Sequence, residues 1–499
     1  MDARVSKGRS VAQELQGTAA AGRVWFLLSS LLLCLAGVLL APLAVAAIYG
    51  EGRIVQAFLS TILLCAIVGI SGVVLFRSSL GTLSRREGFA VVGLGWMLVC
   101  LAGSLPFVFS HTLGFVDALF ECVSGMTGTG ASVIPNIEGV ARGIVFWRSF
   151  THWLGGMGFV VLYIAVFPLL GVGAMQLYQA EAPGPEKDKV TPRIRDTARV
   201  MWLIYIGLSA VLTVLLLAGG MNLFDALCHT FGAIGTGGFS TRNASVGAYH
   251  SAYIEWVILI FLFLAATNFS LYYFLLRGKP MRLFKDPEWR FFTSLVVGIS
   301  LICTILVMVR LHEPFSEALR HGVFSTVSTI TTTGYVTADF EKWPYLAQFL
   351  LVLCLFPGGS AGSTAGAMKS VRVLILLKHV KRQLGFVIHP RMVSPIRLGE
   401  RVLSVAVIRG VLAFIGLYLT VFVISVAGMS LVGLDFTTAV TAVATCMAGC
   451  GPGLADVGPT DTYAFIHPAG KLLLSFCMLA GRLELYTVLL LFTPRFWRR

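Results

Sequence analysis

Charged residues are scarce in this chain, and those present are mostly basic. Lys, Arg, Asp and Glu make up 12% of the 499 residues, about half the share of an ordinary soluble protein. Apolar residues reach 57%, and the mean hydropathy is +0.84. This composition excludes a soluble globular chain. It predicts an integral membrane protein, because many segments hold the roughly 20 apolar residues that a spanning helix needs.

Cysteine pairs and nucleotide motifs are also missing. The ten cysteines lie nearly all inside apolar runs, and no CxxC or Cys/His metal spacing occurs. They are expected to be small hydrophobic residues within helices. The glycine-rich stretch GSTAGAMKS (362–370) lacks the GxxxxGK[ST] pattern, so no P-loop is predicted.

Long apolar runs, in contrast, are abundant. The polar residues 1–23 do not resemble the start of a cleaved signal, so the first run is expected to be a retained helix. Four shorter apolar pieces, at 115–126, 222–234, 315–330 and 435–447, are too short to cross a bilayer and are predicted to be re-entrant. Ten spans are expected, near 24–49, 54–76, 88–109, 145–171, 198–218, 253–276, 291–311, 345–378, 402–428 and 468–493.

The basic residues predict the orientation in the membrane. With ten spans, the basic clusters near 77–86, 187–199, 277–290 and 378–401 and the tail 494–499 fall on one side. The positive-inside rule makes that side cytoplasmic, together with both termini and the connector 178–196. Most of the formal net charge of +14 is thereby explained, and no nucleic acid partner is implied.

One sequence element recurs four times. TGTGA (127–131), GTGGF (235–239), TTTGY (331–335) and AGCGP (448–452) each follow a short apolar piece and precede a long one. Small or hydroxylated residues stand in the same register before them, at Ser124, Gly232, Ser328 and Thr445. The predicted fold is an all-α polytopic membrane protein of four pseudo-symmetric helix–pore-loop–helix repeats, preceded by two extra helices. The repeats are expected at 88–172, 198–276, 291–378 and 402–493, and the extra helix pair at 24–76.

Four such loops suit an ion pore. Non-helical backbone at membrane depth is tolerated where it lines a water-filled cavity, and rings of backbone carbonyls form potassium filters. A short helix that ends just before each loop points the negative end of its dipole at the same place. Glycines at 130, 238, 334 and 451 are expected to adopt a conformation forbidden to other residues. The candidate filter comprises Thr127, Gly128, Thr129, Gly130, Gly235, Thr236, Gly237, Gly238, Thr331, Thr332, Thr333, Gly334, Ala448, Gly449, Cys450 and Gly451.

These motifs resemble those of a known family. The chain is similar to the TrkH-type potassium transporters of bacteria at SGMTGTGASV (124–133), IGTGGFST (234–241), TTTGY (331–335), GCGPGL (449–454), HWLGGMGFVVL (152–162), FPGGSAGSTAGAMKSVR (356–372) and GRLELYTVLLLF (481–492). That family belongs to the superfamily of Trk, Ktr and plant HKT proteins. The resemblance runs from about residue 88 to the end of the sequence. The chain departs from the commonest family pattern at Gly128, where threonine is usual, and at Gly449 and Cys450.

The resemblance implies a transporter and not an enzyme. It implies uptake of K⁺, as the transported ion and without a cofactor, across the bacterial cytoplasmic membrane. It also implies a homodimer in the lipid bilayer and a cytoplasmic nucleotide-binding regulatory subunit of the RCK type, similar to TrkA. The departures at Gly128, Gly449 and Cys450 leave the degree of K⁺ over Na⁺ selectivity open.

The resemblance further implies a gate and an electrostatic barrier beneath the filter. Arg482, deep in the last apolar run, and Lys369 are the expected barrier residues. The sequence PGGSAGSTAG (357–366) is expected to break the second helix of the third repeat. The expected gate loop consists of Gly358, Gly359, Ser360, Ala361, Gly362, Ser363, Thr364, Ala365 and Gly366.

Structural alternatives stand beside these roles. The small residues of 357–366 also fit a close helix-packing patch, and Lys369 could extend to the cytoplasmic interface. Arg482 could form a structural bridge with Glu484 or Glu121. Four acidic residues are expected near the outer mouth, where they could attract cations: Asp117, Glu121, Asp225 and Asp435. Capping of the short helices explains three of them equally well, namely Asp117, Asp225 and Asp435.

Other functions are compatible with parts of the sequence. GGSAG (358–362) matches the GxSxG pattern of serine hydrolases at Ser360, but the strand–turn–helix context and a matched histidine are missing, since His152 and His229 lie on other repeats. A pore that does not discriminate between Na⁺ and K⁺, or a proton-coupled cation transporter, stays open.

Overall fold

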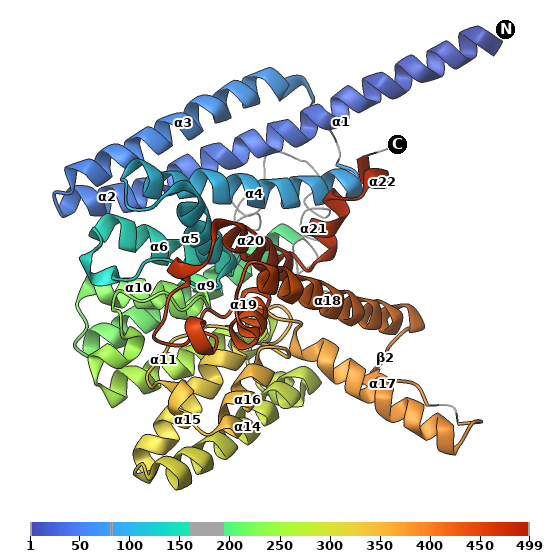
Figure 1. The fold of residues 1–499 in the computed structure, drawn as a ribbon. Helices are drawn as coiled ribbons and strands as arrows, with labels where there is room; N and C mark the ends of the chain where they lie inside the picture. The colour runs from blue at the N-terminus through green and yellow to red at the C-terminus, as the bar shows by residue number, and fades with distance from the viewer. Residues whose placement is uncertain (1, 80, 82, 159–193, 393, 498–499) are drawn as a thin grey trace.

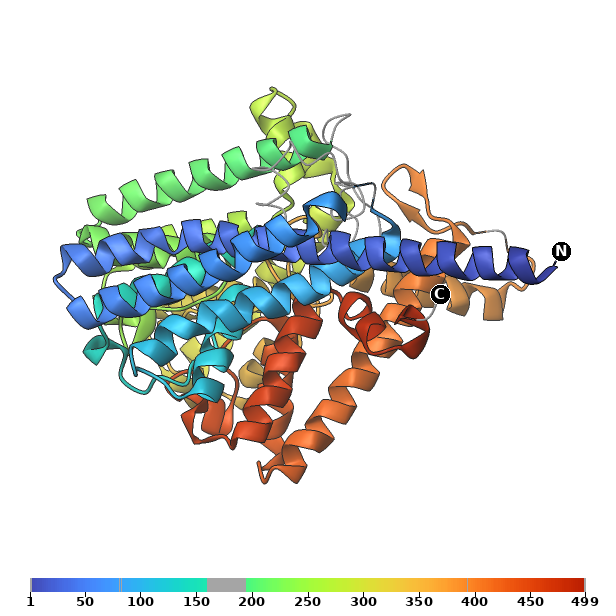
Figure 2. The same ribbon diagram turned by 90° about the horizontal axis from the view of Figure 1, so that it is seen from above.

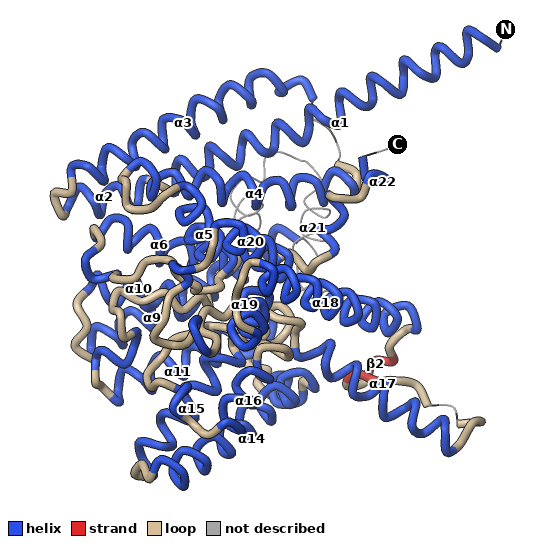
Figure 3. Tube along the Cα trace, in the orientation of Figure 1, coloured by secondary structure: helices blue, strands red, loops and turns tan. Residues whose placement is uncertain are grey.

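The computed structural model describes residues 2–79, 81, 83–158, 194–392 and 394–497. Nearly all of the regular structure in these residues is helical (Figure 3). One two-stranded antiparallel ribbon, β1 Arg397–Leu398 with β2 Arg401–Val402, is its β-structure. The predicted all-α fold is confirmed.

Two long helices precede the repeats. Helix α1 (Asp2–Val38) continues through α2 (Leu40–Ile48), and α3 (Gly52–Phe76) returns along α1 at the edge of the molecule (Figures 1 and 2). Helix α1 begins far before the predicted position 24, because residues 2–23 contain no proline and many good helix formers. The turn before α3 joins this pair to the first repeat: the Glu51 carboxylate accepts the backbone N–H groups of Arg142 (2.6 Å) and Gly143 (2.9 Å).

The first repeat contains α4 (Arg85–Phe109), α5 (Phe115–Thr127) and α6 (Arg142–Gly156). Helix α4 starts with a capping box, in which the Ser84 side chain accepts the Glu87 N–H and the Glu87 side chain accepts the Ser84 N–H. Residues 159–171 of the predicted span 145–171, and most of the connector 178–196, lie outside the described residues.

The second repeat contains α9 (Ile194–Ala218), α10 (Leu223–Ile234), α11 (Ala252–Ala265) and α12 (Phe269–Leu276). A single straight span over 253–276 was expected, but α11 and α12 meet at a bend of 97°. The Asn268 side chain accepts the Ser270 N–H (2.8 Å) and so starts a new helix.

The third and fourth repeats follow the same order. After α13 (Met281–Lys285), the third repeat contains α14 (Pro287–Leu311), α15 (Phe315–Ile330), α16 (Tyr345–Cys354) and α17 (Ser370–Ile388). The fourth contains α18 (Val405–Leu431), α19 (Phe436–Ala448), α20 (Pro468–Arg482) and α21 (Tyr486–Leu491), and α22 (Pro494–Trp497) ends the described chain. Short 3₁₀ turns are η1 (Arg77–Ser79), η2 (Ile137–Gly139), η4 (Ser245–Tyr249), η5 (Phe340–Lys342), η6 (Ala455–Val457) and η7 (Tyr463–Phe465).

Six described helices are long and apolar enough to cross a membrane, or seven when the bent α11–α12 pair is counted as one span. The predicted span 345–378 is divided into α16 and α17, as its glycine-rich stretch suggested. The predicted span 468–493 is unexpectedly divided at Leu483–Leu485, where Glu484 (φ 58°) and Leu485 (φ 53°) adopt the left-handed conformation. The count of ten spans stays a prediction.

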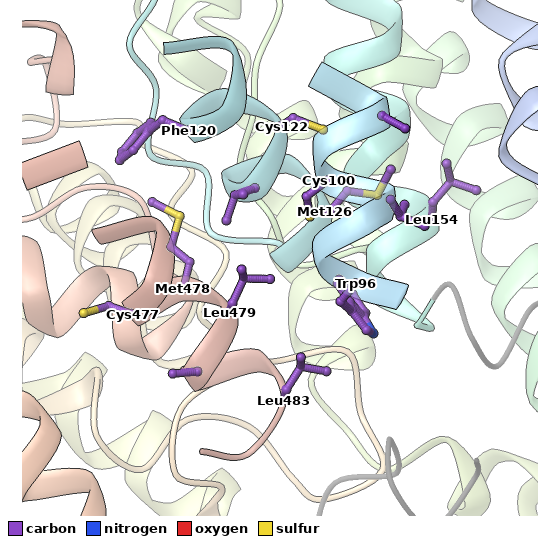
Figure 4. Packing of buried hydrophobic residues seen from close by; sticks show 14 of the residues in the cluster. Trp96, Cys100, Phe120, Cys122, Met126, Leu154, Cys477, Met478, Leu479 and Leu483 are labelled. Atoms are coloured by element: carbon purple, nitrogen blue, oxygen red, sulfur yellow. The ribbon is translucent and has the colours of Figure 1, made fainter. Parts of the chain in front are cut away.

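The hydrophobic core joins the repeats in pairs. One cluster of buried side chains contains residues of α1, α4, α5, α6, α19 and α20 and so unites the N-terminal helices with repeats 1 and 4. Figure 4 shows part of it, with Trp96, Met126, Leu154 and Met478 contributed by four different helices. A second cluster unites repeats 2 and 3. Both cores hold the pore-loop ends of the short helices in fixed positions.

Candidate ion pathway

Each of the four short helices ends in a turn with the same hydrogen-bond pattern. We call the following segments loops 1 to 4: 127–131, 235–239, 331–335 and 448–452. In each, the backbone N–H of the third residue donates to the carbonyl five positions earlier. These hydrogen bonds are Thr129 to Ser124 (2.8 Å), Gly237 to Gly232 (2.8 Å), Thr333 to Ser328 (2.8 Å) and Cys450 to Thr445 (2.9 Å). The acceptors are the residues whose register marked the repeat in the sequence, and the fourfold repetition is therefore structural.

The second residue of each loop adopts the left-handed conformation. The φ angles are 73° at Gly128, 49° at Thr236, 57° at Thr332 and 78° at Gly449. Threonine is strained in this region, whereas glycine is not. Glycine at 128 and 449 thus fits the common loop geometry without strain.

The fourth residue of each loop lies against the next loop. A Cβ atom on Gly130 would overlap the Gly237 carbonyl oxygen, and one on Gly238 would overlap that of Thr333. A Cβ on Gly334 would lie 2.7 Å from Pro452 Cδ. A Cβ on Gly451 would lie 2.6 Å from the carbonyl carbon and oxygen of Gly130. Loop 1 therefore touches loop 2, loop 2 touches loop 3, loop 3 touches loop 4 and loop 4 touches loop 1, in a closed ring.

The expectation that all four of these glycines need a special backbone conformation is wrong for one of them. Gly130, Gly238 and Gly334 have φ angles of 80° or 81°, but Gly451 lies outside the left-handed region. Glycine is required at 451 by the close approach of loop 1 and not by its own backbone angles.

The loops are supported by different side chains. In loop 1 the Thr127 and Thr129 hydroxyls bond each other (2.8 Å), and in loop 3 Thr331 and Thr333 do the same at the same distance. Loop 2 has glycine at both corresponding positions, and loop 4 has buried Ala448 and Cys450. The ring is thus fourfold in its backbone and less symmetric in its side chains.

A buried ion pair supports loops 1 and 2 from behind. Arg148 on α6 donates Nε to the Glu121 carboxylate (2.5 Å) and Nη1 to the Ser240 carbonyl (3.2 Å). Glu121 also accepts the Val133 N–H (2.8 Å) and the Ser132 hydroxyl (2.9 Å). Glu121 is 1% exposed, so it does not face solvent where it could attract cations. It is neutralised by Arg148 within the protein.

Two tyrosines connect other neighbouring repeats. The Tyr335 hydroxyl, at the end of loop 3, donates to the carbonyls of His229 (3.0 Å) and Phe239 (3.2 Å) in repeat 2. The Tyr463 hydroxyl donates to the Gly451 carbonyl (2.8 Å), while its backbone N–H donates to Ser132 of repeat 1 (2.8 Å). Each contact fixes the position of one loop relative to the next.

The candidate gate loop lies directly against loops 3 and 4. Residues 355–369 are not helical, so the alternative of a helix-packing patch is wrong. The Gly366 N–H donates to the Thr332 hydroxyl (2.7 Å), and the Ala367 N–H donates to the Ala448 carbonyl (2.7 Å). Both acceptors lie at the start of a loop, where the short helix ends.

Buried partners hold the other side of this loop. One oxygen of Glu288, at the start of α14, accepts the N–H groups of Ala361 (2.7 Å) and Val371 (3.1 Å). At the bend between α11 and α12, the Ala266 carbonyl accepts the Ser360 N–H (2.9 Å), and the Phe269 N–H donates to Gly362 (3.0 Å). The bend that the sequence did not predict is therefore a docking point for the gate loop.

The segment that directly follows the gate loop stores backbone strain. Ala367 (φ 62°) and Lys369 (φ 72°) are non-glycine residues in the left-handed region, beside Gly358 and Gly362 in the same region. Such residues each cost about 1–3 kcal/mol and persist where the surroundings fix them. A segment of this kind can change conformation once its anchoring contacts are released.

The two candidate barrier residues are directed at backbone carbonyls. Arg482, the last residue of α20, donates to Gly156 (2.7 Å) and Gly155 at the end of α6, and to Thr364 of the gate loop (2.7 Å). Its charge therefore lies at the negative end of the α6 dipole. Lys369 is 4% exposed and donates to the Ala365 carbonyl, so it does not extend to the surface.

Of the two acidic residues considered as partners of Arg482, Glu121 is held by another arginine, and the bridge to Glu484 stays a prediction. Glu121 pairs with Arg148, and Glu484 pairs with Arg372 (2.8 Å). Arg482 thus joins α6, α20 and the gate loop at the side of the ring where the short helices end.

The remaining predicted acidic residues begin the short helices. Asp435 caps α19 by accepting the N–H groups of Thr437 (2.9 Å) and Thr438 (3.1 Å). Asn222, not Asp225, caps α10. Asp117 forms an ion pair with Lys471 (2.6 Å). The capping interpretation is confirmed for Asp435 and wrong for the other two.

A further carboxylate lies on an irregular connection and contacts the segment that follows loop 4. Glu341 on η5 packs against Gly458, whose Cβ position is 2.7 Å from its carboxyl carbon. Burial raises the pKa of Glu341, and the nearby carboxylates Asp339, Asp461 and Asp456 add to this, although a hydrogen bond from Ala455 opposes it. No local sequence motif distinguishes these residues, because the two connections 339–341 and 456–461 become neighbours only in the fold.

Nothing in the described residues supports a hydrolase. The Ser360 hydroxyl is buried and has no hydrogen-bond partner among them. The ring of His152 bonds Gly125 and Phe239, and that of His229 bonds Asp225 and Ser240. Neither histidine is arranged as a base for Ser360.

Comparison with known proteins places these features in a family. The model of the TrkH family, described as a cation transport protein, matches residues 54–499. The Trk system potassium uptake protein TrkH of Escherichia coli K12 is 39% identical over 475 residues, which cover 94% of this chain and 97% of that protein. A protein of the same name from Halomonas elongata is 37% identical over 477 residues, covering 95% and 98%.

A solved structure is similar as well. The crystal structure of the potassium transporter TrkH from Vibrio parahaemolyticus superposes with a TM-score of 0.86 at 35% identity. The match covers 96% of this chain and 99% of that one. The similarity therefore extends over the N-terminal helices and all four repeats.

Proposed function

We propose that this chain, which belongs to the TrkH family of cation transport proteins, takes up potassium ions through the ring of its four loops. The family consists of transporters and not enzymes, and the apolar helices make the chain a membrane protein. The Escherichia coli and Vibrio relatives carry potassium in their names. K⁺ is accordingly the proposed substrate, with no cofactor.

The closed contact ring of Gly130, Gly238, Gly334 and Gly451 is the observation that carries this proposal. Four backbone segments with one hydrogen-bonding pattern meet within the protein interior. Non-helical backbone at this depth is expected only around a cavity or within protein. Carbonyl oxygens of such segments replace the water around a K⁺ ion.

The driving force is the membrane potential. Moving one positive charge inward is favoured by about 2.3 kcal/mol per 100 mV. This alone corresponds to roughly fiftyfold accumulation. Coupling to protons is therefore not required for uptake, and it remains the alternative.

Gating is proposed at residues 358–366. The contacts of Gly366 with Thr332 and of Ala367 with Ala448 support a loop that blocks the path beside loops 3 and 4. Arg482 and Lys369 would add a positive barrier on the same side, since a K⁺ ion is repelled by their charge. A cytoplasmic RCK-type nucleotide-binding subunit, similar to TrkA, would move this loop, and the chain would act as a homodimer.

The bacterial cytoplasmic membrane is the proposed location, with both termini inside. Both described ends of the chain and the basic segment around the β1–β2 ribbon lie toward the same end of the molecule in Figures 1 and 2. This arrangement supports a common cytoplasmic side under the positive-inside rule.

Uptake of ⁸⁶Rb⁺ into liposomes that contain the purified protein tests the function. Uptake should be inhibited strongly by K⁺ and weakly by Na⁺, and it should be lost in Gly334→Asp, whose carboxylate would enter the contact with loop 4. Equal inhibition by Na⁺ would favour the non-selective alternative. Uptake that depends on an imposed pH gradient at zero voltage would favour proton coupling. No uptake, with and without the cytoplasmic partner, would contradict the proposal.

A further inference from the structure

Loop 2 lacks the side chains that brace its counterparts. Loops 1 and 3 each contain two threonines whose hydroxyls bond each other at 2.8 Å. The corresponding positions of loop 2 are Gly235 and Gly237. Two glycines leave a backbone segment with more conformational freedom than threonine would. Another group must therefore hold loop 2 in the shape that the ring requires.

The imidazole of His152 fills the space beside these glycines. His152 lies on α6 of the preceding repeat and is completely buried. A Cβ atom on Gly237 would overlap the Cγ, Nδ1 and Cε1 atoms of this ring, and one on Gly235 would overlap the His152 backbone carbonyl. Gly237 is thus required by the imidazole, because it lies outside the left-handed region and its own backbone would accept alanine. Gly235 is required by the backbone of α6 at position 152.

Two hydrogen bonds determine the form of the ring. His152 Nδ1 lies 2.8 Å from the Gly125 carbonyl oxygen, which can only accept. The Phe239 backbone N–H, which can only donate, lies 3.2 Å from Nε2. Nδ1 therefore carries the proton, Nε2 accepts, and the imidazole is neutral.

The second hydrogen bond acts on a carbonyl of loop 2. The Phe239 N–H and the Gly238 carbonyl belong to one planar trans peptide group, so they point in opposite directions. Nε2, by accepting this N–H, directs the Gly238 carbonyl away from α6. The first hydrogen bond ties the same ring to α5, which carries loop 1.

We propose that neutral His152 is a positioning residue that takes the place of the missing threonine pair, sets the direction of the Gly238 carbonyl and so determines discrimination between K⁺ and Na⁺. The inference rests on the proposed function. Discrimination by a carbonyl ring depends on the number and orientation of its dipoles. Loop 2 forms one quarter of this ring, and its orientation depends on His152. Loss of the histidine should therefore change selectivity more than it changes transport itself.

The test measures ⁸⁶Rb⁺ uptake with K⁺ or Na⁺ as competitor, in proteins first shown to be monodisperse in detergent. In His152→Leu the ratio of the Na⁺ to the K⁺ inhibition constant should fall about tenfold, the effect of one buried hydrogen bond. His152→Gln, whose amide offers a donor and an acceptor together, should retain most of the ratio. His321→Leu, which removes a histidine bonded to Glu313 instead, is the matched control and should keep it fully.

A steric pair of variants tests the placement separately. Gly237→Ala should abolish uptake, because its methyl group overlaps the imidazole, whereas His152→Ala with Gly237→Ala should recover uptake with reduced discrimination. This result also decides the case if His152→Leu does not fold. Unchanged discrimination in His152→Leu, or no recovery in the double variant, would overturn the role of His152. Neither result would contradict the proposed function, because the wild type would still be selective. A wild type inhibited equally by Na⁺ and K⁺ would instead contradict the proposed function.

Discussion

At the scale of single residues, the loops use glycine for two different reasons. Gly334 has a left-handed backbone and a close neighbour. Gly449 has the same kind of backbone but open space around it, because a Cβ atom placed there would be 3.8 Å from its nearest neighbour, the Gly128 oxygen. Gly451 has a close neighbour and an ordinary backbone. Conformation and space can therefore be separated by substitution.

Gly334→Ala should abolish ⁸⁶Rb⁺ uptake, because its methyl group would press Pro452 and separate loops 3 and 4. Gly433→Ala is the matched control: Gly433 has a φ of 102° and no heavy atom within 4 Å of its Cβ position. The control should lower the free energy of unfolding by about 1 kcal/mol and keep uptake and selectivity. Equal losses in both variants would mean that backbone strain alone explains the requirement.

Gly451→Ala and Gly449→Ala form a second pair. The first should eliminate selective uptake although its backbone angles suit alanine, since the methyl group would meet Gly130. The second should retain uptake and lose about 1 kcal/mol of stability. Competition by Na⁺ in the uptake assay checks both. A fully active Gly451→Ala protein would contradict the closed ring.

At the scale of elements, the gate loop is anchored by groups from four different helices or bends. Glu288 matters most among them, because one buried carboxylate oxygen accepts two N–H groups of the loop and its flank. Glu288 lies at the start of α14, directly after the connection between repeats 2 and 3. It therefore ties this connection to the gate loop.

Glu288→Ala should release the gate loop and raise uptake in the absence of any cytoplasmic partner by about tenfold, the effect of about one buried hydrogen bond. Glu288→Gln keeps an acceptor oxygen and should stay close to the wild-type rate. Uptake into liposomes without the partner measures both variants. Lower uptake in a well-folded Glu288→Ala protein would indicate that this contact supports the open state instead.

Much of the element order could be predicted from the sequence. The four short helices were predicted because about 12 apolar residues cannot cross a bilayer, and the non-helical gate loop because four of its residues are glycine. The bend at Ala266–Asn268 was missed, because the surrounding residues are continuously apolar and the bend is stabilised by contacts with a loop about 95 residues later. The break at Leu483–Leu485 was missed for a related reason, since nothing in its local composition opposes a helix.

At the scale of the whole molecule, contacts between repeats determine the site. The sequence placed Glu121 at the mouth and gave His152 no role in the filter, because its motifs describe each repeat separately. Arg148, His152, Tyr335 and Tyr463 all act across a boundary between repeats. Only the fold brings these residues together, and their buried hydrogen bonds make the ring rigid.

The most direct test of the ring is a crystal structure of the protein soaked in Rb⁺, with the anomalous signal of Rb⁺ measured at its absorption edge. The account predicts anomalous peaks on the axis enclosed by Gly130, Gly238, Gly334 and Gly451, within coordination distance of backbone oxygens from all four loops. It further predicts that these peaks disappear in Gly334→Asp crystals. Peaks confined to other parts of the protein, in wild-type crystals whose four loops keep their contacts, would contradict the account.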